Sequence, residues 1–340
     1  MTYRISVIEG DGIGPHIVGL TKQLLSFLAD EYGFTLEFLD APAGDKVEKE
    51  TGEALPKETL NKILSSDACL KGPVGETARD VIVFLRQKLD LYANIRPFKT
   101  YRGVKSRWDN VDFVIVRENT EDLYKSIEDV DEEHGVALLV ITHKATERIA
   151  RVAFNMAMQR RKKVTIVHKA NVLRSYQLFR KTAYEIAEGF KEVKVDDMYV
   201  DNAAYQMIIN PQTFDVILTP NLFGDILSDE AAGVAGTIGI AGSANIGENY
   251  GLFEPVHGSA PTLDPETANP IAQITAAKMM LEWLGEKKNN KNLKQASQIL
   301  SKAVENILNE GKILTPDLGG KYKCSQFIDE LKKEIERLGK

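Results

Sequence analysis

Apolar residues along the chain follow two periodicities. Short runs rich in β-branched residues and bounded by turn residues predict buried strands, and longer stretches with apolar residues every three or four positions predict amphipathic helices. The strand-like runs cover residues 4–10, 111–119, 136–142, 163–171 and 213–220, and helical stretches include residues 15–33 and 146–161. This alternation favours an α/β fold around a mainly parallel sheet.

Composition narrows the class of protein. The chain has 340 residues, 43% of them hydrophobic, which is enough for two domains with sizeable cores. A formal net charge of −6 without a long basic stripe argues against nucleic-acid binding. No apolar run approaches about 18 residues and the chain does not open on a signal-like segment, so we expect neither membrane insertion nor export. Cys69 and Cys324 are far apart and fit a reducing cytoplasm.

Two carboxylates, Asp225 and Asp229, stand four residues apart in an otherwise apolar segment that follows a strand-like run. On a helix this spacing places both on one face near the N-terminus, where their mutual repulsion calls for a cation. Asp201 ends another β-rich run, and carboxylates without His or Cys suit Mg²⁺ or Mn²⁺ rather than zinc. Spacing alone leaves open that one aspartate caps the helix and the other lies on the surface.

Four arginines lie beside apolar or motif residues, namely Arg86, Arg96, Arg102 and Arg117. A guanidinium grips a carboxylate through two hydrogen bonds, so converging arginines indicate a small polycarboxylate ligand. Taken singly, each is more often a surface ion-pair residue, and Arg102 keeps that interpretation.

Three other positions carry candidate chemistry with an ordinary alternative. Lys169 follows an apolar strand, where a desolvated amine can serve as a general base, although many lysines simply end strands. His257 lies in a loop of small residues, free to stack on a ring or to act structurally. The loop 9–15 has glycines at alternate positions, which does not match the dinucleotide fingerprint, and a tight strand-to-helix turn explains it equally well. Tyr124 by itself is an ordinary tyrosine, and only the motif that contains it, RENTEDLY (117–124), makes it a candidate.

Taken together, the segments resemble the β-decarboxylating dehydrogenases, the family of isocitrate, homoisocitrate and 3-isopropylmalate dehydrogenases, and above all its archaeal-type 3-isopropylmalate members. The matching motifs occur in the family's order over nearly the whole chain. They are IEGDGIGP (8–15), LDLYANIRP (89–97), VIVRENTEDLY (114–124), HKANVL (168–173), NLFGDILSDEAA (221–232), GSANIG (242–247), FEPVHGSAP (253–261), ANP (268–270) and TPDLGG (315–320).

The resemblance implies a two-domain α/β fold with a non-Rossmann nucleotide site and a dimer arm. A larger nucleotide-binding domain would combine residues 1–91 with 236–340. A smaller domain, 92–235, would carry the dimer interface, the arm and the metal and substrate residues. The implied assembly is a homodimer, or a tetramer of such dimers.

The implied reaction is the NAD-dependent oxidative decarboxylation of an alkyl- or carboxyalkyl-malate. In it, Lys169 of the neighbouring subunit would take the proton of the C2 hydroxyl, and Tyr124 would protonate C3 after carbon dioxide leaves. The malate carboxylates would be held by Arg86, Arg96 and Arg117. Mg²⁺ or Mn²⁺ would be held by Asp225, Asp229 and the partner's Asp201.

The resemblance also implies a nucleotide site. Its residues would be Asn171, Glu254, His257, Gly258, Ser259, Ala260, Asp264 and Asn269. His257 and Asn269 would lie near the adenine, and Glu254 and Asn171 near the nicotinamide end. NAD-using members commonly carry an aspartate where this chain has Thr262, so Asp264 would have to reach the ribose instead. No basic residue lies between positions 258 and 269, which favours NAD over NADP.

Substrate choice in the family depends on the side chains that precede the first arginine. Here Ile82 and Val83 stand one turn before Arg86, and apolar groups favour an isopropyl substituent over an unpaired carboxylate. We therefore expect 3-isopropylmalate, and hence leucine biosynthesis. Homoisocitrate is the first alternative, because Arg79 could pair with a longer substrate's terminal carboxylate, and isocitrate is the second.

Two other classes of protein share some of these features. A metal-dependent phosphoesterase also uses clustered aspartates, and a periplasmic-type binding protein also grips carboxylates between two α/β domains. The first would release phosphate without a nucleotide, and the second would bind without turnover.

Overall fold

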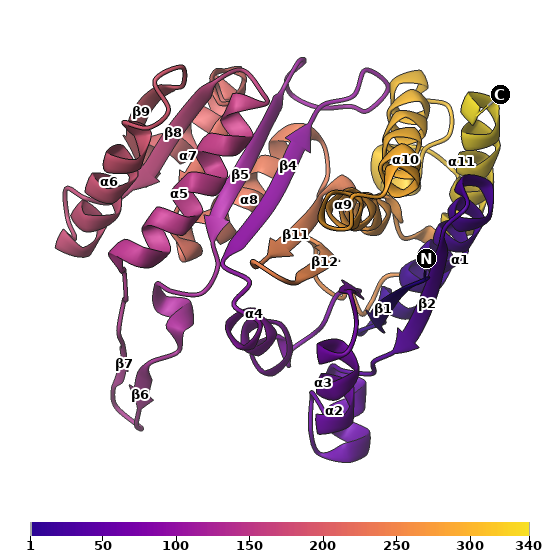
Figure 1. The fold of residues 1–340 in the computed structure, drawn as a ribbon, viewed down its shortest axis with the longest axis horizontal. Coiled ribbons are helices and arrows are strands. Elements are labelled where there is room, and N and C mark those ends of the chain that lie inside the picture. The colour runs from indigo at the N-terminus through magenta and orange to yellow at the C-terminus, as the bar shows by residue number, and fades with distance from the viewer. Residues whose placement is uncertain (1, 340) are drawn as a thin grey trace.

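The computed structural model describes residues 2–339 and is built around one ten-stranded sheet (Figure 1). Its strands are β1 (Thr2–Ile8), β2 (Thr35–Asp40), β3 (Ala68–Lys71), β4 (Ala93–Lys99), β5 (Asp112–Glu118), β8 (Lys163–His168), β9 (Lys194–Tyr199), β10 (Val216–Thr219), β11 (Gly242–Ile246) and β12 (Gly251–Pro255). They are arranged in the order β2-β1-β3-β12-β11-β4-β5-β10-β8-β9. The α/β fold expected from the sequence is confirmed.

Helices connect and cover the strands. They are α1 (Gly14–Tyr32), α2 (Asp45–Thr51), α3 (Lys57–Leu64), α4 (Phe84–Lys88), α5 (His143–Met158), α6 (Arg174–Ala187), α7 (Val200–Ile209), α8 (Asn221–Ala235), α9 (Ile271–Lys287), α10 (Lys291–Glu310) and α11 (Cys324–Gly339). A π-helical turn, η1 (Arg79–Val83), leads directly into α4. The predicted helices at 15–33 and 146–161 correspond to α1 and α5.

The sheet changes character at its centre. Its two flanks, β2-β1-β3-β12 and β5-β10-β8-β9, are parallel. Between them β12, β11, β4 and β5 pair antiparallel. Parallel neighbours need crossover connections, which here are mostly helical. The antiparallel central strands join the two parallel flanks into one sheet.

The buried apolar residues form separate clusters on the two flanks. Two clusters draw on residues 3–91 and 240–335, together with Val104. The other two draw on residues 93–241. We propose that these pairs of clusters are the cores of two domains, with boundaries close to those expected from the family resemblance.

One predicted strand, 136–142, does not join the main sheet. Only its start is extended: β7 (Gly135–Ala137) pairs with β6 (Glu128–Val130) in a two-stranded hairpin that projects away from the sheet (Figure 1). Val130 and Val136 on this hairpin are 71% and 59% exposed. The apolar pattern there marks an exposed ribbon rather than a core strand, because no neighbouring strand covers it.

The glycine-rich loop 9–15 is a turn that brings three segments together. Gly10 and Gly12 have φ values of 73° and 57°, and a Cβ on either would lie 2.0 Å from the carbonyl oxygen of Pro73 or Ser259. Only glycine combines that backbone with such close approach. The carboxylate of Asp11 accepts hydrogen bonds from the backbone N–H groups of Asp45, Lys46 and Gly75. The loop therefore fixes the position of the N-terminus of α1.

Within residues 2–339, no helix is both long and apolar enough to cross a lipid bilayer.

Two helical glycines predict opposite effects of adding a methyl group. A Cβ at Gly224 in α8 would lie 2.6 Å from Cγ of Arg117, whereas a Cβ at Gly19 in α1 would meet no atom within 4 Å. We expect Gly224→Ala to destabilise the protein by about 1–3 kcal/mol through overpacking. We expect Gly19→Ala to stabilise it by about 0.5–1 kcal/mol, because alanine favours the helix. Urea unfolding measures both, and a Gly224→Ala protein as stable as the wild type would contradict the close packing of α8 on β5.

Candidate active site

Strands β4 and β5 carry two arginines on one face of the sheet. Asn94 of β4 is directly opposite Arg117 of β5, so Asn94, Arg96 and Arg117 point to the same side. Arg96 is 5% exposed and Arg117 is fully buried. Nε and Nη2 of Arg117 donate to Oδ1 of Asn221, at 3.0 and 2.7 Å. Asn221 is the first residue of α8, so this contact ties the start of the helix to the arginine.

Asp225, one turn further along α8, is the counter-ion of both arginines. Its Oδ1 accepts from Arg117 Nη1 and lies 3.4 Å from Arg96 Nη1. Burial disfavours the ionised carboxylate, but Arg117 and Arg96 outweigh it and hold the pKa of Asp225 below its usual value. Burial and repulsion from Arg96 lower the pKa of Arg117 to about 9, so the guanidinium stays charged at neutral pH.

Tyr124 completes this group from η2 (Leu123–Lys125). Its hydroxyl donates to Oδ2 of Asp225 at 2.6 Å, and its ring lies 5.0 Å from the guanidinium of Arg117. Burial and the charge of Asp225 raise the pKa of Tyr124. The tyrosine is therefore a neutral phenol at physiological pH.

Asp229 lies on the same helix face but is not paired. Within residues 2–339 its carboxylate makes no hydrogen bond or ion pair. Burial raises its pKa, attraction to Arg96 opposes the rise, and repulsion from Asp225 adds to it. The helical spacing predicted for Asp225 and Asp229 is present in the structure.

A second buried ion cluster surrounds Glu254 on β12. Its Oε2 accepts from Lys71 Nζ at 2.8 Å and its Oε1 from Arg86 Nη2 at 3.1 Å. Asn245 also donates to Oε1, at 2.8 Å. Burial disfavours the charged form, yet Lys71 and Arg86 overcome it and lower the pKa of Glu254 to about 2.

Asparagines connect the two ion clusters. Oδ1 of Asn245 accepts from Arg86 Nε at 3.0 Å and from Asn94 Nδ2 at 2.6 Å, and Asn94 Oδ1 accepts from Arg96 Nε at 2.7 Å. Our sequence reasoning missed Lys71, Asn94 and Asn245 as site residues. The available signal was a buried polar residue inside an apolar strand, because such a group must find a partner.

Lys169 and Asp201 come together in a different place. Lys169 Nζ forms an ion pair with Oδ1 of Asp201, and 66% of the Asp201 side chain is exposed. Within the described chain neither residue contacts Asp225 or Asp229 by a hydrogen bond or ion pair. The structure thus brings together Asp225, Asp229, Tyr124 and the arginines, but not the expected base and third metal ligand.

The loop after β12 holds the residues expected to bind the nucleotide. The backbone oxygen of Ser259 accepts from Ile13 N at 3.0 Å, so this loop is anchored to the start of α1. Gly258 and Ala260 are exposed, and Ala260 has a positive φ of 42°. Burial lowers the pKa of His257, which keeps the ring neutral, and within residues 2–339 its buried Nε2 has no hydrogen-bond partner.

Asn269 and Asp264 already have local roles. Nδ2 of Asn269 donates to Asp317 Oδ2 at 3.0 Å, and its Oδ1 accepts from the backbone of Ile271 at the start of α9. Asp264 is exposed, and its Oδ1 caps a short 3₁₀ turn at Glu266. Asn171, the remaining predicted residue of this group, is exposed near Lys169.

The two apolar residues expected to contact the substrate differ in exposure. Ile82 is 7% exposed and packs in a core cluster beside Leu85. Val83 is half-buried, and Phe84 is 44% exposed. Of the predicted pair, Val83 is therefore the side chain with open surface on the helix that carries Arg86.

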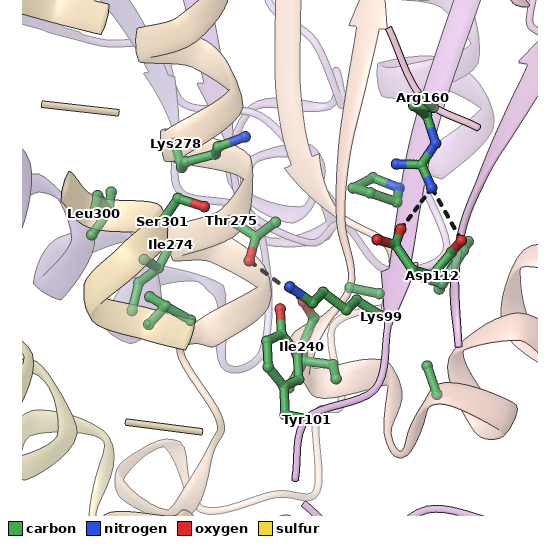
Figure 2. A pocket seen from close by; sticks show the side chains of 15 residues that line it. Lys99, Tyr101, Asp112, Arg160, Ile240, Ile274, Thr275, Lys278, Leu300 and Ser301 are labelled. Atoms are coloured by element: carbon green, nitrogen blue, oxygen red, sulfur yellow. Dashed lines mark hydrogen bonds and ion pairs between the residues drawn. The ribbon is translucent and has the colours of Figure 1, made fainter. Parts of the chain in front are cut away.

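A cavity of about 290 Å³ lies elsewhere, between β4 and β5 on one side and α9 and α10 on the other (Figure 2). Lys99, Tyr101, Thr275 and Lys278 line it, and none of the predicted site residues does. The active site predicted from the sequence thus does not lie in this cavity.

The donors of Asp225 and Asp229 fit a hard divalent cation. Both are carboxylates on one helix face, one is held ionised and the other is unpaired. Among the described residues, no three His, Cys, Asp or Glu side chains gather as a cation site.

Comparison with known proteins agrees with this geometry. The model of the isocitrate/isopropylmalate dehydrogenase family matches residues 4–331, and the chain belongs to that family. The protein is thus a metal-dependent decarboxylating dehydrogenase, as its motifs led us to expect.

Two similar proteins and one solved structure cover almost the whole chain. The 3-isopropylmalate/3-methylmalate dehydrogenase of Methanocaldococcus jannaschii is 50% identical over 98% of this chain and 99% of its own. The isocitrate/homoisocitrate dehydrogenase of Thermus thermophilus is 45% identical over 99% of this chain and 100% of its own. The isocitrate dehydrogenase structure from Methylococcus capsulatus matches with a TM-score of 0.90 and 40% identity, covering 98% and 99% of the two chains.

The cluster around Glu254 predicts a pH-dependent loss of stability. Its folded pKa of about 2 lies below its ordinary value, so the folded state holds fewer protons and the stabilisation is complete above about pH 4.5. It is lost as the pH falls toward 2. We expect Glu254→Gln to cost about 3 kcal/mol at pH 7 and progressively less below pH 4.5.

Urea unfolding at several pH values measures this difference. Glu286→Gln is the matched control and should have little effect at any pH, because it removes an exposed carboxylate of α9 that forms no ion pair among the described residues. A cost of Glu254→Gln that does not change with pH would contradict the assigned ionisation.

Proposed function

We propose that this enzyme converts 3-isopropylmalate to 2-oxo-4-methylpentanoate with NAD, in leucine biosynthesis. The observation that carries the proposal is the juxtaposition of three buried arginines with an apolar helix surface at Val83. The arginines suit the carboxylates of a malate, and the apolar surface suits its alkyl substituent. The relative from Methanocaldococcus jannaschii, named for two alkylmalates, supports the same substrate class.

Homoisocitrate is the second candidate substrate. The relative from Thermus thermophilus is named for isocitrate and homoisocitrate. A carboxyalkyl group would need a cation near Val83, and Arg79 at the start of η1 is the nearest one on the N-terminal side of Val83.

Asp225 and Asp229 would hold Mg²⁺ or Mn²⁺ together with Asp201 from a second copy of the chain. The bound ion would polarise the oxygen atoms at the reacting carbons of the substrate. Arg86, Arg96 and Arg117 would orient the carboxylates, with Ile82 supporting Val83 from the core side. The buried positions of these arginines exclude water from around the bound carboxylates.

Lys169 of the second copy would remove the proton of the C2 hydroxyl. Tyr124 would donate a proton to C3 after carbon dioxide departs, which requires a phenol that is protonated at neutral pH. The raised pKa of Tyr124 meets that requirement. The ionised Asp225 that accepts its hydrogen bond keeps the hydroxyl directed into the site.

NAD would lie against the loop 257–264 and accept the hydride from C2. The neutral His257 and Asn269 would face the adenine, with Glu254 and Asn171 toward the nicotinamide end. Gly258, Ser259 and Ala260 would present backbone groups to the nucleotide. The exposed carboxylate of Asp264 disfavours a 2′-phosphate, which supports NAD over NADP.

We also propose that the protein is a homodimer with shared sites. Support comes from the separation of Lys169 and Asp201 from Asp225, and from apolar side chains left exposed on nearby elements. Those side chains are Tyr199, Tyr205, Ile208 and Ile226 around α7 and α8, and Val130 and Val136 on the hairpin. Reduced, buried Cys69 and Cys324 support a cytoplasmic location.

Turnover with three substrates tests the reaction and the substrate together. NADH formation should require Mg²⁺ or Mn²⁺ and be fastest with 3-isopropylmalate, compared with homoisocitrate and isocitrate, while NADP should support little turnover. Faster turnover of homoisocitrate would make it the substrate. Release of phosphate from phosphate esters, without turnover of any malate, would contradict the assignment.

Mixing inactive variants tests whether two chains build each site. Lys169→Met and Asp229→Asn should each abolish turnover, but a co-refolded equimolar mixture should recover about a quarter of wild-type activity, because half the dimers then hold one intact site. A mixture of Lys169→Met with Asp201→Asn is the matched control and should recover nothing. Recovery by the control, or by neither mixture, would contradict the shared site.

A further inference from the structure

The helix that selects the substrate is tied to the base of the hairpin at two points. Arg79 Nη1, in η1, lies 2.8 Å from Oε1 of Glu128, the first residue of β6. Eight residues later, Gln87 Nε2 in α4 donates to the backbone oxygen of Tyr124 at 2.6 Å. The segment 124–128 therefore runs alongside this helix.

Val83 lies between the two ties. Residues four apart share a face of a helix, so Arg79, Val83 and Gln87 lie in a row facing the segment 124–128. The row begins on a π-helical turn, a rare form that occurs often at functional sites. Tyr124, at the end nearer Gln87, contacts Asp225. A substituent at C3 would extend from Tyr124 past Val83 toward Arg79.

At the far end of this row, the charge of Arg79 is neutralised by Glu128. Arg79 is 64% exposed and Glu128 is 36% exposed, and neither forms another ion pair within residues 2–339. Asp80 and Glu76, beside Arg79, are exposed, and Lys125 is the cation of the facing segment 124–128. The guanidinium of Arg79 could bind a substrate carboxylate, but it is already paired with the carboxylate of Glu128 on the hairpin.

We propose that Glu128 determines the substrate class of this enzyme by occupying Arg79. This inference rests on the proposed function, because it assumes that the C3 substituent of a malate passes Val83. With Arg79 neutralised, the site accepts an alkyl group. A carboxyalkyl substrate must displace Glu128, which is tethered next to Arg79 and competes at high effective concentration.

Removing the charge of Glu128 should free Arg79 without unfolding the protein, because an exposed ion pair contributes little to folding. In Glu128→Gln we expect the ratio of kcat/KM for homoisocitrate to kcat/KM for 3-isopropylmalate to rise about three- to tenfold. The change should come mainly from a lower KM for homoisocitrate. The kcat for 3-isopropylmalate should stay near the wild-type value.

Two further variants separate this role from a general charge effect. Asp129→Asn removes an exposed carboxylate from the next position of β6, which points to the opposite side of the ribbon, and should leave the ratio unchanged. The double variant Arg79→Gln with Glu128→Gln should lose the gain. A gain that persists in the double variant, or that Asp129→Asn reproduces, would overturn the proposal.

Binding measurements keep the inference separate from the proposed reaction. Wild-type turnover of 3-isopropylmalate tests the proposed function by itself. If turnover fails, or if Glu128→Gln is inactive with both substrates, calorimetric titration with 3-isopropylmalate and homoisocitrate in the presence of Mg²⁺ still compares affinities. Glu128→Gln should then bind homoisocitrate three- to tenfold tighter relative to 3-isopropylmalate than the wild type does. Equal relative affinities in the two proteins would show that Glu128 does not set the substrate class.

Discussion

Two buried guanidinium groups need a carboxylate beside them, and Asp225 is that carboxylate. Removing Arg96 and Arg117 from water costs several kcal/mol per ion unless each charge is paired and hydrogen-bonded. Asp225 reaches both only because α8 begins at Asn221, against Arg117, and because Gly224 lets the helix lie close to β5. The position of α8 and the central strands thus follows from one electrostatic requirement.

The antiparallel centre of the sheet carries the polar contacts that hold these buried charges. Hydrogen bonds run from Lys71 on β3 through Glu254, Asn245 and Asn94 to Arg96 on the central strand β4. The ion pairs of Asp225 with Arg96 and Arg117 continue this connection to β5 on the other flank. The flanks carry separate apolar clusters, so this polar chain is a link between them that does not depend on apolar packing. It also makes the arginines proposed to bind the substrate part of the structure that joins the two halves.

The sequence predicted the parts of this arrangement that depend on local pattern. Strand and helix periods located β1, β5, β8, β10, α1 and α5, and the spacing of Asp225 and Asp229 predicted a shared helix face. It could not predict that Glu254 would be held by Lys71 on the neighbouring strand β3 and by Arg86 on α4, because these residues are more than 150 positions from Glu254 and meet it only in the folded chain. The run 136–142 misled us for the same reason: whether an apolar strand is covered depends on neighbours that its own residues do not specify.

Charge balance explains why the site suits a dicarboxylate. Four cations, Lys71, Arg86, Arg96 and Arg117, face two carboxylates, Glu254 and Asp225, within direct ion-pair contact. The excess positive charge is buried, and water cannot screen it as it does on the surface. Asp229 stands nearby and is attracted by Arg96 and Arg117, but within residues 2–339 its carboxylate forms no direct ion pair with them. A ligand that brings two carboxylates supplies the missing charge. We propose that the arginines bind such a ligand while keeping their contacts to Asp225 and Glu254.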